Sequence, residues 1–176
     1  PYICVGGTSS FSYSERPTQI INDCKALIIH LRSVYQGQIV LTVSDIVDEM
    51  VFRPIAAELE LPLIALSTPV QQAVDILGNA DAYIGGRWHS SIFSLRGGTP
   101  VVPMVSKTFK MYALMEMAGL ETRLCDAHDL VAAKESVSSQ LVGFLKQGES
   151  LRARLRQWAE TQAEYSWGNV SFLKTY

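Results

Sequence analysis

The chain has 176 residues, the size of one domain; 48% of them are hydrophobic and 18% are charged. This composition excludes intrinsic disorder. The net charge of −2 excludes an overall basic field of the kind that attracts nucleic acid. No apolar stretch approaches the roughly 18 residues that span a bilayer, so we expect no transmembrane segment.

The chain starts at Pro1, without an initiator methionine, and is rich in apolar residues for one domain. We therefore expect a fragment of a longer protein that turns part of its apolar surface to a missing partner. Its three cysteines, Cys4, Cys24 and Cys125, are far apart and show no CxxC spacing. This pattern indicates buried thiols in a reducing compartment. We expect a cytoplasmic location, compatible with peripheral contact with the inner membrane face, and neither a metal nor a cofactor.

Short apolar runs alternate with segments of helical periodicity along the whole chain. We expect strands at residues 2–5, 38–43, 63–66, 82–84 and 100–105, with a short sixth strand at 124–125. We expect helices at about residues 16–35, 45–60, 70–79, 88–97, 109–118 and 130–164. Gly6 and Gly7 are expected to stop the first strand, Pro54 to kink or restart the second helix, and Gly148 to break the last one.

Six alternations of strand and helix predict βαβ units and a parallel sheet. Right-handed crossovers then give a doubly wound, mostly parallel, Rossmann-like sheet of about six strands with helices on both faces. In such a sheet, ligands bind beyond the carboxyl ends of the strands. That rule selects the loops at residues 6–14, 44–46, 67–70, 85–90 and 106–111.

The sequence GGRWHSS follows the fourth predicted strand and opens a helix. Gly86 lets a ligand approach the backbone, and the helix N-terminus with Ser90 offers hydrogen-bond donors to an anion. Arg87 adds a planar fork that suits carboxylate or phosphate. His89 can donate to an anion or move a proton near neutral pH. The alternative is that His89 packs under Trp88 and that Arg87 is a solvated charge.

Two lysines follow the fifth predicted strand, Lys107 and Lys110. Either could present a point charge to the same anion from the neighbouring loop. A lysine at a helix start opposes the helix dipole, and an anion between the two would explain its presence. The alternative is an ordinary surface lysine.

The first loop is rich in glycine and hydroxyl groups, and Gly7, Thr8 and Ser9 could cradle part of a ligand through backbone N–H groups. The loop lacks the GxGxxG pattern, and Asp45 after the second strand is better interpreted as a helix cap than as a ribose ligand. We therefore discount NAD. The chain also lacks the GxSxG and P-loop motifs.

Residues 83–103 read YIGGRWHSSIFSLRGGTPVVP. This block resembles the polysaccharide pyruvyl transferase family, with Arg-x-His at a strand end, a helix, a small-residue turn and Pro-Val-Val. Lys110, about ten residues before Gly119 and Leu120, continues the family pattern, which Lys107 fits less well. The resemblance covers roughly residues 38–120. Trp88 departs from it, because the family often has a smaller aliphatic residue there.

The resemblance implies a glycosyltransferase-B-like fold of two Rossmann-like halves with the active site between them. Residues 1–176 would be a single domain, the C-terminal half, and an N-terminal domain would be its missing partner. The last helical segment, about residues 130–176, is then expected to pack back on the missing lobe.

The implied activity is transfer of a pyruvyl group from phosphoenolpyruvate to a sugar hydroxyl, with ketal formation, in exopolysaccharide or cell-envelope polysaccharide biosynthesis. The acceptor would be a glycan or a lipid-linked sugar, and this chain would supply the donor-binding half. By the resemblance, Arg87 and Lys110 bind the phosphate and carboxylate of the donor, and His89 protonates its methylene carbon. Two alternatives stay open: a glycosyltransferase-B domain that uses a nucleotide-sugar, and a non-catalytic module that binds sugars or anions.

Overall fold

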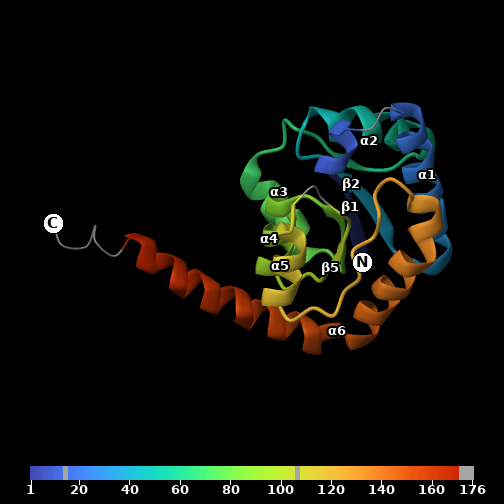
Figure 1. Ribbon diagram of the computed structural model, residues 1–176. Helices are drawn as coiled ribbons and strands as arrows, with labels where there is room; N and C mark the ends of the chain where they lie inside the picture. The colour runs from blue at the N-terminus through green and yellow to red at the C-terminus, as the bar shows by residue number, and fades with distance from the viewer. Residues whose placement is uncertain (14–15, 106–107, 171–176) are drawn as a thin grey trace.

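The computed structural model describes residues 1–13, 16–105 and 108–170, and Figure 1 shows a sheet with helices on both faces. Within these residues the sheet has five strands, all parallel, in the order β3-β2-β1-β4-β5. The strands are β1 (Tyr2–Thr8), β2 (Gln38–Thr42), β3 (Leu63–Ile64), β4 (Tyr83–Gly86) and β5 (Val101–Pro103). The strand order reverses its direction between β1 and β4, which confirms the predicted doubly wound, Rossmann-like fold.

Six α-helices of the described residues surround the sheet. They are α1 (Pro17–Val34), α2 (Ile46–Leu59), α3 (Val70–Asn79), α4 (Trp88–Arg96), α5 (Lys110–Met117) and α6 (Leu130–Trp167). A short 3-10 helix, η1 (Ser9–Tyr13), follows β1. Helices α1 and α2 lie on one face of the sheet, and α3 and α4 lie on the other (Figure 1). This placement of the helices is the one that right-handed βαβ crossovers produce.

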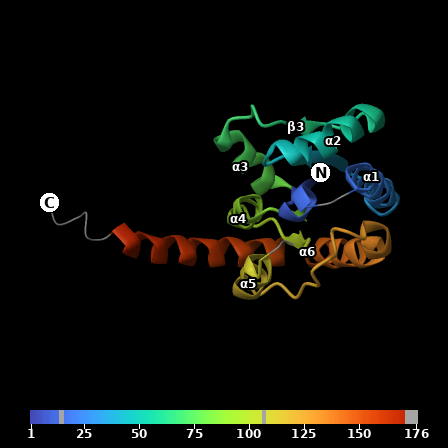
Figure 2. The same cartoon turned by 45° about the horizontal axis from the view of Figure 1, so that its top comes forward.

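Helix α6 breaks at Gly148, as predicted, where the backbone takes φ 55° and ψ −135°. Its first half packs along α1, where His30 Nε2 lies 3.1 Å from Ser138 Oγ. Its second half passes α4 and then extends away from the rest of the molecule (Figure 2). Within the described ranges, no helix combines the length and the apolar character that crossing a membrane requires.

The central strands are buried on both faces, which explains their continuous apolar runs. Ile3, Leu41 and Ile84 have no exposed surface. The three cysteines are free and buried, as predicted. Burial raises the pKa of Cys4 to about 12 and also raises that of Cys24, so both thiols stay protonated at neutral pH.

The prediction that Gly6 and Gly7 stop the first strand is wrong, because β1 continues to Thr8. A Cβ at Gly6 would lie 2.5 Å from the Tyr83 hydroxyl, and a Cβ at Gly7 would overlap the Asp48 carboxylate. Both glycines therefore make room for neighbouring side chains. They do not form a turn, and a strand lies where the sequence predicted the start of a loop.

Two further elements differ from the predictions. The segment at Cys125 forms only an isolated bridge with Met104, so the described sheet has five strands rather than about six. Of the two outcomes predicted at Pro54, a kink or a restart, the structure excludes the restart, because α2 runs from Ile46 to Leu59 as one helix. Proline removes one helical hydrogen bond, and the carbonyl it leaves, on Met50, belongs to a residue whose side chain is 67% exposed.

Candidate active site

The point where the strand order reverses carries the residues that the sequence singled out. Gly86 ends β4, Arg87 is the N-cap residue of α4, and His89 lies in the first turn of that helix. No described side chain caps α4, so its first N–H groups point out of the helix without an intrahelical acceptor. The positive end of the helix dipole lies at the same place, which favours an anion.

A cavity of about 330 Å³ opens in front of this helix end, and we call it the Arg87 cavity. Its lining residues are Ser9, Ser44, Asp45, Gly86, Arg87, Trp88, His89, Thr108, Lys110 and Met111. The structure therefore brings together five of the predicted site residues: Ser9, Gly86, Arg87, His89 and Lys110. His89 and Lys110 are exposed, and neither of these side chains is packed into the core.

The other predicted site residues lie elsewhere. Gly7 and Thr8 are buried within β1, and Thr8 Oγ1 donates a hydrogen bond of 2.8 Å to the Val105 carbonyl. Ser90 is buried and turns toward a neighbouring cavity, with its hydroxyl 2.9 Å from that of Ser44. Lys107 lies outside the described residues. Thr8 therefore holds the loop after β5 in place, because its hydroxyl is already engaged.

Arg87 is held by two acidic residues at the start of α2. Its Nε and Nη2 donate to the Asp48 carboxylate at 3.0 Å and 2.7 Å, and Nη2 lies 2.5 Å from Asp45 Oδ2. Asp45 is also the predicted helix cap, because its Oδ1 accepts from the Asp48 N–H at 2.9 Å. The ion pair with Asp48 was missed by sequence reasoning. Within the described residues, Nη1 of Arg87 makes no hydrogen bond, so this nitrogen is left for a ligand.

Asp48 is completely buried, and burial raises the pKa of its carboxyl above the usual range. Hydrogen bonds from Arg87 and from the Ser44 N–H lower that pKa again, but only in part. Burial lowers the pKa of Arg87, and its two carboxylate partners more than offset that effect. The guanidinium therefore remains charged. The buried Asp48 carboxylate, whose charge is unfavourable to bury, fixes the orientation of the guanidinium.

This arrangement predicts how Asp48→Asn changes the pH dependence of stability. The pKa of Asp48 is higher in the folded than in the unfolded chain, so the folded chain binds the proton more tightly. The unfolding free energy of the wild type should therefore fall relative to that of Asp48→Asn as pH rises from about 4, the usual carboxyl pKa, through the folded pKa. Urea unfolding of both proteins across this pH range measures the difference. If the unfolding free energy of the wild type instead rose relative to that of Asp48→Asn as pH rises, the ion pair with Arg87, and not burial, would dominate the pKa of Asp48.

The groups around the cavity could bind a small anion and exchange a proton with it. Arg87 and Lys110 supply two cations from two different elements, and the first amides of α4 add uncharged donors. Asp45 opposes such an anion, because its carboxylate lies against the same guanidinium. His89 stands at the rim and can exchange a proton with a bound molecule.

A model of the family described as polysaccharide pyruvyl transferase matches residues 2–108. The chain belongs to the polysaccharide pyruvyl transferase family. The match includes β1 to β5 together with Arg87 and His89, and it confirms the family that the block at residues 83–103 predicted. A search of curated proteins finds no match.

The matched range differs from the predicted one at both ends. It begins at residue 2 and not near 38, so the first strand and helix also carry the pyruvyl transferase signal. It ends at residue 108, two residues before Lys110. The role of Lys110 therefore depends on its place at the Arg87 cavity, and not on the family match.

Proposed function

We propose that the chain binds phosphoenolpyruvate in the Arg87 cavity and transfers its pyruvyl group to a sugar during exopolysaccharide or cell-envelope polysaccharide biosynthesis. The observation that carries this proposal is the convergence of Arg87, His89 and Lys110 on one cavity of a pyruvyl transferase. Phosphoenolpyruvate carries a phosphate and a carboxylate as substituents of one carbon, C2. Arg87 Nη1, the amides of α4 and Lys110 would bind these two groups.

The reaction needs one proton delivered to carbon, and His89 would supply it. Addition of a sugar hydroxyl to C2 of phosphoenolpyruvate forms a C–O bond while C3 takes a proton from His89 and becomes a methyl group. The phosphate then leaves with the electrons of its C2–O bond, and a second hydroxyl of the sugar adds to the cation. Two hydroxyl protons are released: one reprotonates His89, and the other leaves with phosphate or solvent.

In this proposal the chain supplies the donor-binding half of a larger active site of the glycosyltransferase-B type. Exposed apolar side chains next to Lys110 support this idea. Phe109 is 79% exposed and Tyr112 is 59% exposed, and both flank Lys110 at the start of α5. Large apolar side chains beside a charged cavity are typical of a surface that another domain covers.

Titration calorimetry with separate ligands tests the donor. We expect phosphoenolpyruvate to bind the chain, with an affinity that falls in Arg87→Ala and in Lys110→Ala, and uridine diphosphate not to bind. Binding of uridine diphosphate without phosphoenolpyruvate would instead favour a glycosyltransferase. Phosphoenolpyruvate binding without any ketal product, with the acceptor and the N-terminal half both present, would favour a non-catalytic module.

Replacing Asp45 with asparagine should strengthen donor binding. Asn caps a helix about as well as Asp, so the start of α2 should be preserved. The substitution removes a negative charge that lies 2.5 Å from the Arg87 guanidinium and competes with the donor for it. We expect roughly fivefold tighter binding of phosphoenolpyruvate, the factor that about 1 kcal/mol gives for a partly exposed ion pair.

Calorimetry of Asp45→Asn beside Asp75→Asn measures this effect. Asp75 is exposed on α3 and does not line the Arg87 cavity, so the control changes the net charge equally without touching the site. Equal affinities of the two variants would show that Asp45 does not compete with the donor.

A further inference from the structure

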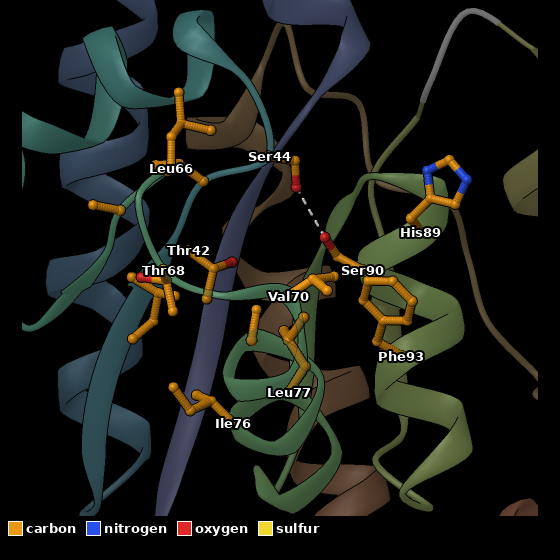
Figure 3. A pocket seen from close by; sticks show the side chains of 14 residues that line it. Thr42, Ser44, Leu66, Thr68, Val70, Ile76, Leu77, His89, Ser90 and Phe93 are labelled. Atoms are coloured by element: carbon orange, nitrogen blue, oxygen red, sulfur yellow. Dashed lines mark hydrogen bonds between the residues drawn. The ribbon is translucent and has the colours of Figure 1, made fainter.

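A second cavity lies beside the first, between α3 and α4 at the carboxyl ends of β2 and β3 (Figure 3). Its volume is about 350 Å³, within the range of sites that hold small molecules. We call it the Phe93 cavity. Its lining residues are Thr42, Val43, Ser44, Ile64, Ala65, Leu66, Thr68, Val70, Ala73, Ile76, Leu77, His89, Ser90 and Phe93.

The walls of the Phe93 cavity indicate an uncharged ligand. Among the residues that the structure describes, the lining includes no lysine, arginine, aspartate or glutamate, and His89 is the one titratable side chain. Most of the wall is aliphatic, with the aromatic ring of Phe93 on one side, and hydroxyl groups gather where β2 ends (Figure 3). A phosphate or carboxylate would find no counter-charge here. A neutral ring with apolar faces and hydroxyl groups at its edge can contact both the apolar wall and the hydroxyl groups at the end of β2.

Thr42 carries a polar atom that the folded chain leaves without a partner. The residue is 5% exposed, and within the described chain its Oγ1 has no hydrogen-bond partner. Figure 3 shows this hydroxyl turned toward the side of the cavity where Ser44 and Ser90 lie. A buried hydroxyl without a partner costs stability, so such groups are rare unless a ligand or water satisfies them.

The two cavities share part of their walls. Ser44 and His89 line both of them, and the Ser44 hydroxyl is 2.9 Å from that of Ser90 at the boundary. A molecule in the Phe93 cavity would therefore meet a molecule in the Arg87 cavity next to His89. This is the geometry that a transfer between two substrates requires.

We propose that the Phe93 cavity binds one neutral sugar ring of the acceptor. The ring lies between Leu66 and Phe93, which stand on opposite sides of the cavity (Figure 3), and one ring hydroxyl bonds to Thr42. The ring edge toward Ser44 and His89 then presents the hydroxyls that attack the donor. This inference rests on the proposed function, and it adds the acceptor subsite to the same chain.

The test is saturation-transfer NMR on the full chain with methyl glycosides of glucose, galactose, mannose and their N-acetylamino counterparts, in the presence of phosphoenolpyruvate. Thr42→Val removes the hydroxyl and keeps the shape. We expect it to weaken binding of the preferred glycoside roughly three- to tenfold, the factor of one neutral hydrogen bond. The same variant should unfold at a higher temperature, because it removes an unpartnered buried hydroxyl. Thr18→Val, exposed on α1 across the sheet, should change neither property.

The outcomes separate this inference from the proposed function. Unchanged glycoside affinity in Thr42→Val, or no binding by any glycoside of the panel, overturns the acceptor subsite even if phosphoenolpyruvate binds. Uridine that displaces the glycoside and loses affinity in Thr42→Val assigns the cavity to a nucleoside and overturns it too. Failure of phosphoenolpyruvate to bind the wild type rejects the donor proposal, whereas glycoside binding that depends on Thr42 would still support a sugar site.

Discussion

In the full-length enzyme, with the N-terminal half present, replacing His89 with alanine is expected to slow ketal formation by about 10²–10⁴-fold, the usual contribution of a general acid. The affinity for phosphoenolpyruvate should stay within a few-fold of that of the wild type, because Arg87 and Lys110 carry the anion contacts in the proposed complex. His89 is exposed in the first turn of α4, so its loss should leave the fold intact. The effect should therefore appear in kcat and not in KM.

Deuterium incorporation follows the proton that C3 receives. In heavy water, the methyl group of the pyruvyl ketal should carry one deuterium, and His89→Ala should lower its rate of formation as strongly as it lowers kcat. His128→Ala is the matched control, because His128 is exposed in the loop before α6 and does not line the Arg87 cavity. A His89→Ala variant that turns over at the rate of the control would remove His89 from the mechanism.

The order of elements and the place of Arg87 and His89 could be predicted from the sequence. Alternating periodicities identify strands and helices because a buried parallel strand is apolar along its length, whereas a covering helix is apolar on one face only. Once the sheet is parallel, the carboxyl end of every strand lies at one edge, so GGRWHSS after the fourth strand had to reach the ligand side. Local signals were sufficient for both conclusions.

The partners of Arg87 could not be predicted in the same way, because they depend on strand order. Strands β2 and β4 both neighbour β1, so the start of α2 meets the start of α4 across Gly7. Asp48 therefore reaches Arg87 although 39 residues separate them. One local signal existed: Asp48 lies on the same helix face as Val51 and Phe52, which are buried. An acidic residue on an apolar face indicates a buried partner.

The same dependence on tertiary contacts explains the glycines. Gly6 and Gly7 have the composition of a loop, but the atoms that exclude a Cβ there belong to Tyr83 and Asp48, which are distant in sequence. Likewise, the Phe93 cavity is lined by residues from the ends of β2 and β3 and from α3 and α4, so no single segment of the sequence predicts it. Thr42, whose hydroxyl has no partner among the described residues, lies in β2, and the sequence of that strand gives no sign of this.

The largest loss of stability is expected from Gly97→Ala, at the contact between α3 and α4. A Cβ at Gly97 would overlap the backbone of Gly78, and backbone atoms cannot rotate away as a side chain can. The end of α3 is also held in place, because the single hydroxyl proton of Thr99 is shared between the carbonyls of Gly78 and Ala80, each 2.9 Å from Oγ1. Arg152 donates to the Ala80 carbonyl as well, at 2.6 Å. We expect a loss of about 3 kcal/mol, at the upper end for overpacking.

For a chain of this length, about 3 kcal/mol corresponds to a fall in Tm of roughly 6–12 °C, which calorimetry can measure. Gly143→Ala is the matched control: Gly143 lies inside α6, and no atom of another described segment lies within 4 Å of an added Cβ, so alanine should stabilise the helix by about 0.5–1 kcal/mol. A Tm of Gly97→Ala equal to that of the control would show that α3 and α4 can separate freely. Because these helices also form the walls of the Phe93 cavity, a folded Gly97→Ala variant should bind the acceptor glycoside more weakly while its affinity for phosphoenolpyruvate is maintained.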